Sequence, residues 1–167
     1  MQYDEYEALL NRSCSQLKLE PHCIEIGPFC TPTTTTPNTA PWQMEWCVLF
    51  PDRMYLVVRE NWWDVKGERR RIGYRKDFAF HYGPANPKRN HDGIPVRDNK
   101  KFPAVLRIDS DHKGPHLHFN GEDHILQARV LNLSISQVDV FDFVRAVLKH
   151  RRSGKGFDRI LGFEILP

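Results

Sequence analysis

The sequence predicts an α+β fold, in which an antiparallel, curved sheet carries a C-terminal helix packed on one of its faces. Strand-like runs, separated by turns and one long loop, lie between 42 and 119, and one strong helical pattern follows at 137–152. The 167 residues and a hydrophobic content of 40% fit a single domain over 1–167 with its own core. An amphipathic helix beside such a sheet buries its apolar stripe against it.

The N-terminal quarter contains one predicted helix and one predicted loop. Residues 3–18 place tyrosines and leucines at near-helical spacing, which predicts a short helix. The segment 28–41 is rich in Thr and Pro, with four consecutive threonines at 33–36, and we expect it to be a loop.

Alternating apolar residues predict the strands of the sheet. The first two strands, 45–50 and 53–60, are joined by a tight turn at Pro51–Asp52. A third strand at 72–82 places Phe78, Phe80 and Tyr82 on one face and His81 on the other.

A Pro-rich stretch at 83–103 is predicted to be a long loop, which in a compact domain is often functional or mobile. Strands at 104–108 and 115–119 then flank a turn at 111–114. We expect one more strand at 126–133.

The clearest helix is predicted at 137–152. Ser136 is its expected N-cap and Gly154 its expected C-cap. Basic residues in the last turn complement the helix dipole. The chain is expected to close with a strand at 157–166.

The formal net charge of +3 permits an anionic partner but does not require one. Basic residues gather at 66–76 and at 149–159, either as solvated surfaces or as a phosphate-contacting face. In the second case we expect nucleic-acid contacts from Arg69, Arg70, Arg71, Arg75 and Lys76, with stacking on Trp62 and Trp63.

Cysteine usage and the N-terminus indicate a cytoplasmic protein. None of the four cysteines forms a CxxC pair, and their spacing fits no common zinc ribbon. The first ten residues carry acidic groups where a signal peptide needs basic ones. No apolar run approaches the roughly 18 residues that cross a bilayer, so we expect no membrane partner.

Histidines concentrate between 112 and 124. His116 and His118 are two apart on a predicted strand, so both rings face one side while Leu117 points to the core. His112 lies across a Lys-Gly-Pro turn and is expected to converge on the same point. The competing interpretation is a chance group of surface or core histidines.

Two chemistries suit such a cluster. A divalent transition metal such as zinc takes three or four N or O ligands, here His112, His116 and His118 with Asp109 or Glu122.

RNA cleavage without a cofactor instead uses histidines as general base and acid. Arg107 or Lys113 would stabilise the phosphate charge, and His81 is a secondary candidate for the same site.

The spacing His116-Leu-His118 followed by Glu122 matches the HxH-x3-E core of the first cupin motif. The glycine expected before that core is Ser110, and no second motif follows. The likeness to cupins is therefore partial.

The order of motifs resembles TumE-type toxins of toxin–antitoxin pairs. Phe80-His81-Tyr82 ends an aromatic strand, and Arg107-Ile-Asp109 precedes the histidine-rich 111–118, within a resemblance that covers roughly 74–125. It implies a growth-inhibiting toxin with ribonuclease activity, neutralised by an antitoxin. The site residues that it implies are His81, Arg107, Asp109, His112, His116 and His118.

The sequence thus supports three functions. The first is a toxin of a toxin–antitoxin or defence system that cleaves single-stranded RNA. The second is a metal-binding enzyme of cupin-like geometry. The third is a non-enzymatic accessory module that binds another protein through its loops.

Overall fold

The structure is a computed structural model of the chain. It describes residues 5–6, 8–9, 11–12, 15, 25–27, 31–32, 42–64, 73–90, 93, 95–96, 101, 103–111, 114–119, 128–130, 133–134, 137–161 and 164–165.

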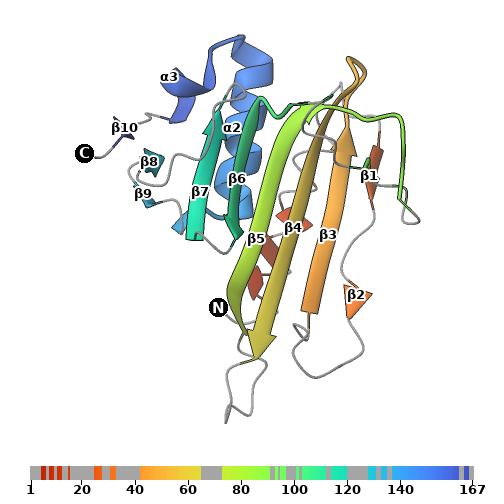
Figure 1. The fold of residues 1–167 in the computed structure, drawn as a ribbon, viewed down its shortest axis with the longest axis vertical. Helices are drawn as coiled ribbons and strands as arrows, with labels where there is room; N and C mark the ends of the chain where they lie inside the picture. Colours follow the sequence, from red (N-terminus) through yellow and green to blue (C-terminus); the bar gives the residue numbers. More distant parts are fainter. Residues whose placement is uncertain are drawn as a thin grey trace.

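An antiparallel sheet dominates the fold (Figure 1). Its strands are β1 (Glu25–Gly27), β2 (Thr31–Pro32), β3 (Trp42–Leu49), β4 (Met54–Asp64), β5 (Gly73–Pro84), β6 (Leu106–Asp111) and β7 (Gly114–Phe119). They pair in the order β1-β3-β4-β5-β6-β7, and β2 also pairs with β3. From β3 to β7 each strand pairs with the next in the chain, as is common for consecutive strands.

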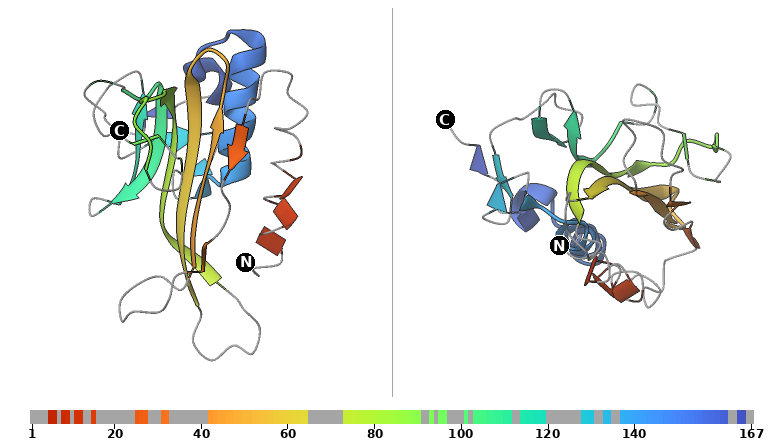
Figure 2. Two further views of the ribbon diagram at one scale, coloured as in Figure 1. Left: turned by 90° about the vertical axis from the view of Figure 1, so that its right-hand side faces the viewer. Right: turned by 90° about the horizontal axis from the view of Figure 1, so that it is seen from below.

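The helix α2 (Val140–Ser153) lies across one face of this curved sheet (Figure 2). The predicted α+β architecture is therefore confirmed. The helix starts later than expected, because its N-cap is Asp139, whose side chain accepts a hydrogen bond from the N–H of Asp142 at 2.8 Å. The expected N-cap, Ser136, lies outside the described residues. Gly154 ends the helix at φ 65°, the left-handed conformation that glycine adopts most easily.

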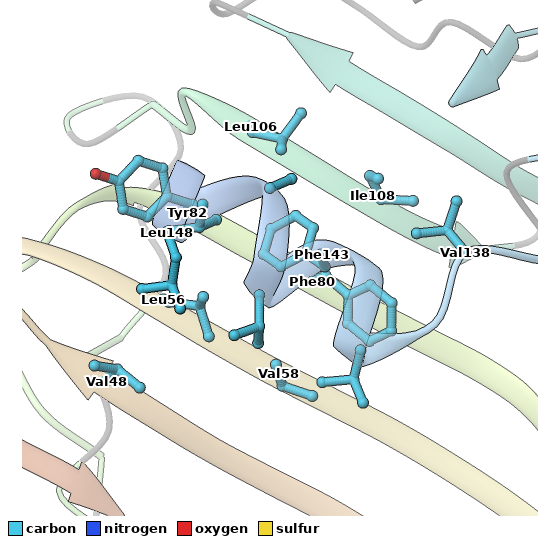
Figure 3. Packing of buried hydrophobic residues seen from close by; sticks show 14 of the residues in the cluster. Val48, Leu56, Val58, Phe80, Tyr82, Leu106, Ile108, Val138, Phe143 and Leu148 are labelled. Atoms are coloured by element: carbon cyan, nitrogen blue, oxygen red, sulfur yellow. The ribbon is translucent and has the colours of Figure 1, made fainter. Parts of the chain in front are cut away.

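The main core fills the space between α2 and the sheet (Figure 3). Phe80 of β5 and Phe143 of α2 are buried, with ring centroids 5.4 Å apart. Leu106 and Ile108 of β6 and Leu117 of β7 point to the same side. Since strand side chains alternate between faces, the intervening residues of β5, β6 and β7 lie on the sheet face away from α2.

The C-terminal part differs from the prediction of strands at 126–133 and 157–166. Instead of the first strand the structure has two short ones, β8 (Ala128–Val130) and β9 (Leu133–Ser134), the second of which extends one residue past that range. In the range 157–166 it has the helix α3 (Phe157–Leu161) and the strand β10 (Glu164–Ile165), which pairs with β8. Phe157 and Ile160 of α3 are buried in the main core. The apolar residues of this segment are therefore the buried side of a helix and not of a strand.

The structure describes parts of the two predicted loops. The 28–41 segment contains the short strand β2, because Thr31 and Pro32 pair with the edge of β3. Strand β5 runs on to Pro84, one residue beyond the expected start of the second loop. Between 85 and 105 the described residues form no helix or ladder strand, only an isolated bridge between Arg89 and Pro95.

Within the described part of the chain, no helix is both long and apolar enough to cross a membrane.

Candidate functional site

Strand register places the predicted site residues in two rows on the sheet face away from α2. In one row His81 of β5 pairs with Arg107 of β6, which pairs in turn with His118 of β7. In the next row Asp109 of β6 lies opposite His116 of β7. Directly opposed residues have Cβ atoms about 5 Å apart, so neighbouring members of each row are within side-chain contact.

Asp109 is the residue that joins this cluster. Its Oδ1 lies 2.8 Å from Nε2 of His116 and 3.9 Å from Nε2 of His118. Its other oxygen, Oδ2, forms an ion pair with the guanidinium of Arg107. One oxygen of the Asp109 carboxylate therefore faces the imidazole rings of His116 and His118, and the other faces the positively charged Arg107.

The His116 ring is oriented by Gly114, the first residue of β7. Its Nδ1 lies 2.8 Å from the carbonyl oxygen of Gly114, and because a carbonyl only accepts hydrogen bonds, Nδ1 carries the proton in this contact. Gly114 has φ 89°, a conformation that favours glycine at the start of β7. In a neutral ring this arrangement turns the lone pair of Nε2 towards Asp109.

Asp109, His116 and His118 form a potential metal site. One ligand atom from each lies within 4.8 Å of the others, and the two imidazole rings have centroids 4.9 Å apart. Two metal–ligand bonds of about 2.1 Å span at most about 4.2 Å, so a side-chain shift of about half an ångström would let all three reach one ion.

The cluster is largely buried, and two of its described residues form its accessible edge. The side chains of His116 and Asp109 are 0% and 3% exposed, whereas those of His118 and Arg107 are 15% and 18% exposed. A molecule arriving from solvent therefore meets Arg107 and His118 first.

His81 is fully buried at the inner end of its row. Its ring lies 5.0 Å from that of Tyr55 on β4, and Tyr55 belongs to a small apolar cluster with Cys47 and Val57. A Cβ atom built on Gly83 would lie 3.2 Å from Nε2 of His81 and 3.1 Å from the Pro103 carbonyl oxygen. Because residue 83 has no side chain, the backbone at Pro103 and Ala104 can pack closely against Gly83, next to His81.

Several predicted site residues lie elsewhere or outside the described part. His112, Lys113, Glu122 and the arginines Arg69, Arg70 and Arg71 lie outside the described residues, and Arg75 and Lys76 are part of β5. Trp62 belongs to the core: it is 8% exposed and its ring packs 4.6 Å from that of Tyr6. Trp63, the next residue, is partly buried.

The second basic segment does not share the face of the histidine cluster. It begins on α2, which covers the opposite side of the sheet. Arg151 in this segment binds Asp52 at 2.9 Å and the hydroxyl of Tyr82 at 3.0 Å, and its guanidinium lies 3.9 Å from the centre of the Phe50 ring. Arg151 therefore links the C-terminal end of α2 to the sheet through Asp52 and Tyr82.

The sequence predicted a cluster of His112, His116 and His118 with Asp109 or Glu122. The described geometry groups Asp109 with His116 and His118, whereas His112 and Glu122 lie outside the described residues. Asp109 joins the two histidines because the pairing of β6 with β7 sets it opposite His116. By contrast, no local pattern in the sequence predicted that the ring of Tyr55 lies beside that of His81.

No family model, no curated protein and no solved structure matches this chain significantly.

Proposed function

We propose that this protein is a metal-dependent enzyme whose centre consists of Asp109, His116 and His118. The observation that carries the proposal is the convergence of these three side chains from two paired strands, with their ligand atoms within 4.8 Å. Two histidines and one carboxylate on one side of an ion are a known ligand set of catalytic metal sites, because they leave other positions open for water or substrate.

The contact between Asp109 and His116 supports a cation at this point. Nε2 and Oδ1 are 2.8 Å apart, yet Oδ1 accepts no hydrogen bond in the described residues. With Nδ1 donating to the Gly114 carbonyl, a neutral His116 would bring one lone pair against another, which is unfavourable in a buried place. A proton or a metal ion between the two atoms removes this repulsion.

The surroundings of the ligands also suit a metal centre. The Gly114 carbonyl fixes the ring of His116, and the Arg107 guanidinium fixes Asp109 through its second oxygen. Such outer contacts commonly orient metal ligands and set the imidazole tautomer. A bound ion would supply Lewis acidity and lower the pKa of a bound water, which is the basis of metal-assisted hydrolysis.

Metal binding is tested by elemental analysis and calorimetric titration of protein purified without a histidine tag. We expect close to one equivalent of a divalent transition metal in the wild type, and at least about a tenfold loss of affinity in His118→Gln. The matched control is His150→Gln, since His150 lies on α2, against Phe157. A wild type that holds less than about a tenth of an equivalent and binds no added ion contradicts the proposal.

A second candidate function is metal-free cleavage of single-stranded RNA by a toxin of a toxin–antitoxin pair. One observation favours it: five of the six residues in the resembling motifs lie in two adjacent rows on one sheet face. These are His81, Arg107, Asp109, His116 and His118. The sixth, His112, lies outside the described residues.

In that reaction one histidine would take the proton of the 2′-hydroxyl while the 2′-oxygen attacks phosphorus. A second acid would protonate the departing 5′-oxygen, which leaves a 2′,3′-cyclic phosphate. His118 is the more accessible of the two described histidines of β7. EDTA separates the candidates: RNA cleavage that persists in EDTA and is lost in His118→Gln supports the toxin reaction, and intact RNA under those conditions argues against it.

A further inference from the structure

Arg107 stands at the accessible edge of the cluster with unused hydrogen-bonding capacity. Its side chain is 18% exposed and lies between His81 and His118 in the strand register. One of its terminal nitrogens pairs with Asp109, and its Nε is buried with no hydrogen-bonding partner among the described residues. A buried donor without a partner is unfavourable, and an acceptor that reached it would stabilise the site.

The charges of the cluster point to what that acceptor is. Asp109 and Arg107 neutralise each other, so a divalent ion at Asp109, His116 and His118 would leave a double positive charge that the described residues of the cluster do not compensate. Burial makes such a charge expensive unless an anion accompanies it. A planar guanidinium with several N–H donors is well suited to bind an oxyanion through two parallel hydrogen bonds.

We infer that the substrate of this centre carries an oxyanion, a phosphate or a carboxylate, that binds the metal ion and Arg107 together. This inference rests on the proposed metal centre. Arg107 then has two roles: one nitrogen positions Asp109, and the remaining donors bind the substrate. A substrate could reach Arg107 from solvent, because Arg107 and His118 are the more exposed side chains of the cluster.

The test uses the cobalt(II)-loaded full-length protein and its visible absorption spectrum, which responds to a change of ligand at the metal. Inorganic phosphate, dimethyl phosphate and acetate are titrated separately, so that a phosphomonoester-like, a phosphodiester and a carboxylate group are distinguished. We expect at least one of them to shift the spectrum saturably. Its affinity should fall at least about tenfold in Arg107→Gln and recover partly in Arg107→Lys, which keeps the charge.

Arg59→Gln is the matched control, because Arg59 lies on the same sheet face but is paired with Glu45. It should bind cobalt and the oxyanion like the wild type. If the wild type binds no cobalt, the metal centre itself is overturned, and this inference with it. If cobalt binds but none of the three anions shifts the spectrum, or Arg107→Gln binds them as tightly as the wild type does, only the role of Arg107 is overturned.

Discussion

The Oδ1 atom of Asp109 lies 2.8 Å from Nε2 of His116, on the sheet face that α2 does not cover. The two residues are direct cross-strand partners, so the β6–β7 ladder holds their side chains in contact. The first prediction therefore concerns a substitution at Asp109.

Replacing Asp109 by Asn should weaken metal binding by more than about 100-fold, because the amide oxygen keeps the shape of the ligand but loses its negative charge. Calorimetric titration of the metal into both proteins measures this. Asp77→Asn is the control, since Asp77 lies on the same face of β5 but outside the cluster. Equal affinities in Asp109→Asn and the wild type would remove Asp109 from the ligand set.

Adding a methyl group at Gly83 should disturb His81. The new Cβ would lie 3.1–3.2 Å from His81, Pro103 and Ala104, and two of these three contacts are with backbone atoms that cannot rotate away. We expect Gly83→Ala to lower the free energy of unfolding by about 1–3 kcal/mol and to shift the His81 ring resonances. Chemical denaturation and NMR spectroscopy measure the two effects.

Gly93→Asn serves as the control for that substitution, because nothing lies within 4 Å of a Cβ at Gly93 and Asn tolerates its φ of 79°. If Gly83→Ala keeps the wild-type stability and leaves the His81 resonances unchanged, the backbone at Pro103 and Ala104 moves aside at little cost, which contradicts the prediction.

The stability of the protein should fall above about pH 10, the ordinary pKa of a tyrosine. Burial raises the pKa of Tyr82, and this outweighs the hydrogen bond from Arg151, which lowers it. The unfolded chain therefore loses the Tyr82 proton at a lower pH than the folded chain does, so folding becomes less favourable as the pH rises through this range.

Urea unfolding of the wild type and Tyr82→Phe at pH 8.5 and pH 10.5 measures this contribution. Tyr82→Phe removes the hydroxyl that Arg151 binds at 3.0 Å, at a cost of about 1 kcal/mol at the lower pH. Its further loss between the two pH values should be smaller than that of the wild type. Identical losses in the two proteins would assign the alkaline destabilisation to other groups.

Truncating Phe143 should destabilise the fold strongly, because its buried ring fills the layer between α2 and Phe80. We expect Phe143→Ala to lower the free energy of unfolding by about 3–5 kcal/mol. Phe141→Ala on the same helix is the control, since Phe141 is only partly buried and lies under the guanidinium of Arg145. Chemical denaturation that shows equal losses would contradict the placement of the core.

The local pattern of the chain was sufficient for the main elements and for the faces of the strands. The alternation in 78–82 assigned Phe80 to the core and His81 to the opposite face, and the structure confirms both. The pair His116 and His118 was assigned to one face by the same period of two. Gly154 was recognised as the helix end because few other residues adopt its conformation.

Tertiary structure decided what local pattern does not encode. The segment 157–166 is apolar enough for a strand, but its first half buries Phe157 and Ile160 as a helix against α2. Trp62 was expected to be available for stacking on bases, yet it packs on Tyr6, a neighbour that comes from far along the chain.

By itself, then, the sequence determined the α+β class, the strand faces and the presence of a histidine pair next to acidic and basic groups. Only the folded chain decided that Asp109 is the group shared by His116, His118 and Arg107, because that depends on the register between strands. It also decided that α2 and its basic end lie on the other side of the sheet. The physical reason is that periodicity fixes which face a side chain occupies, whereas its partners are fixed by pairing and packing between segments.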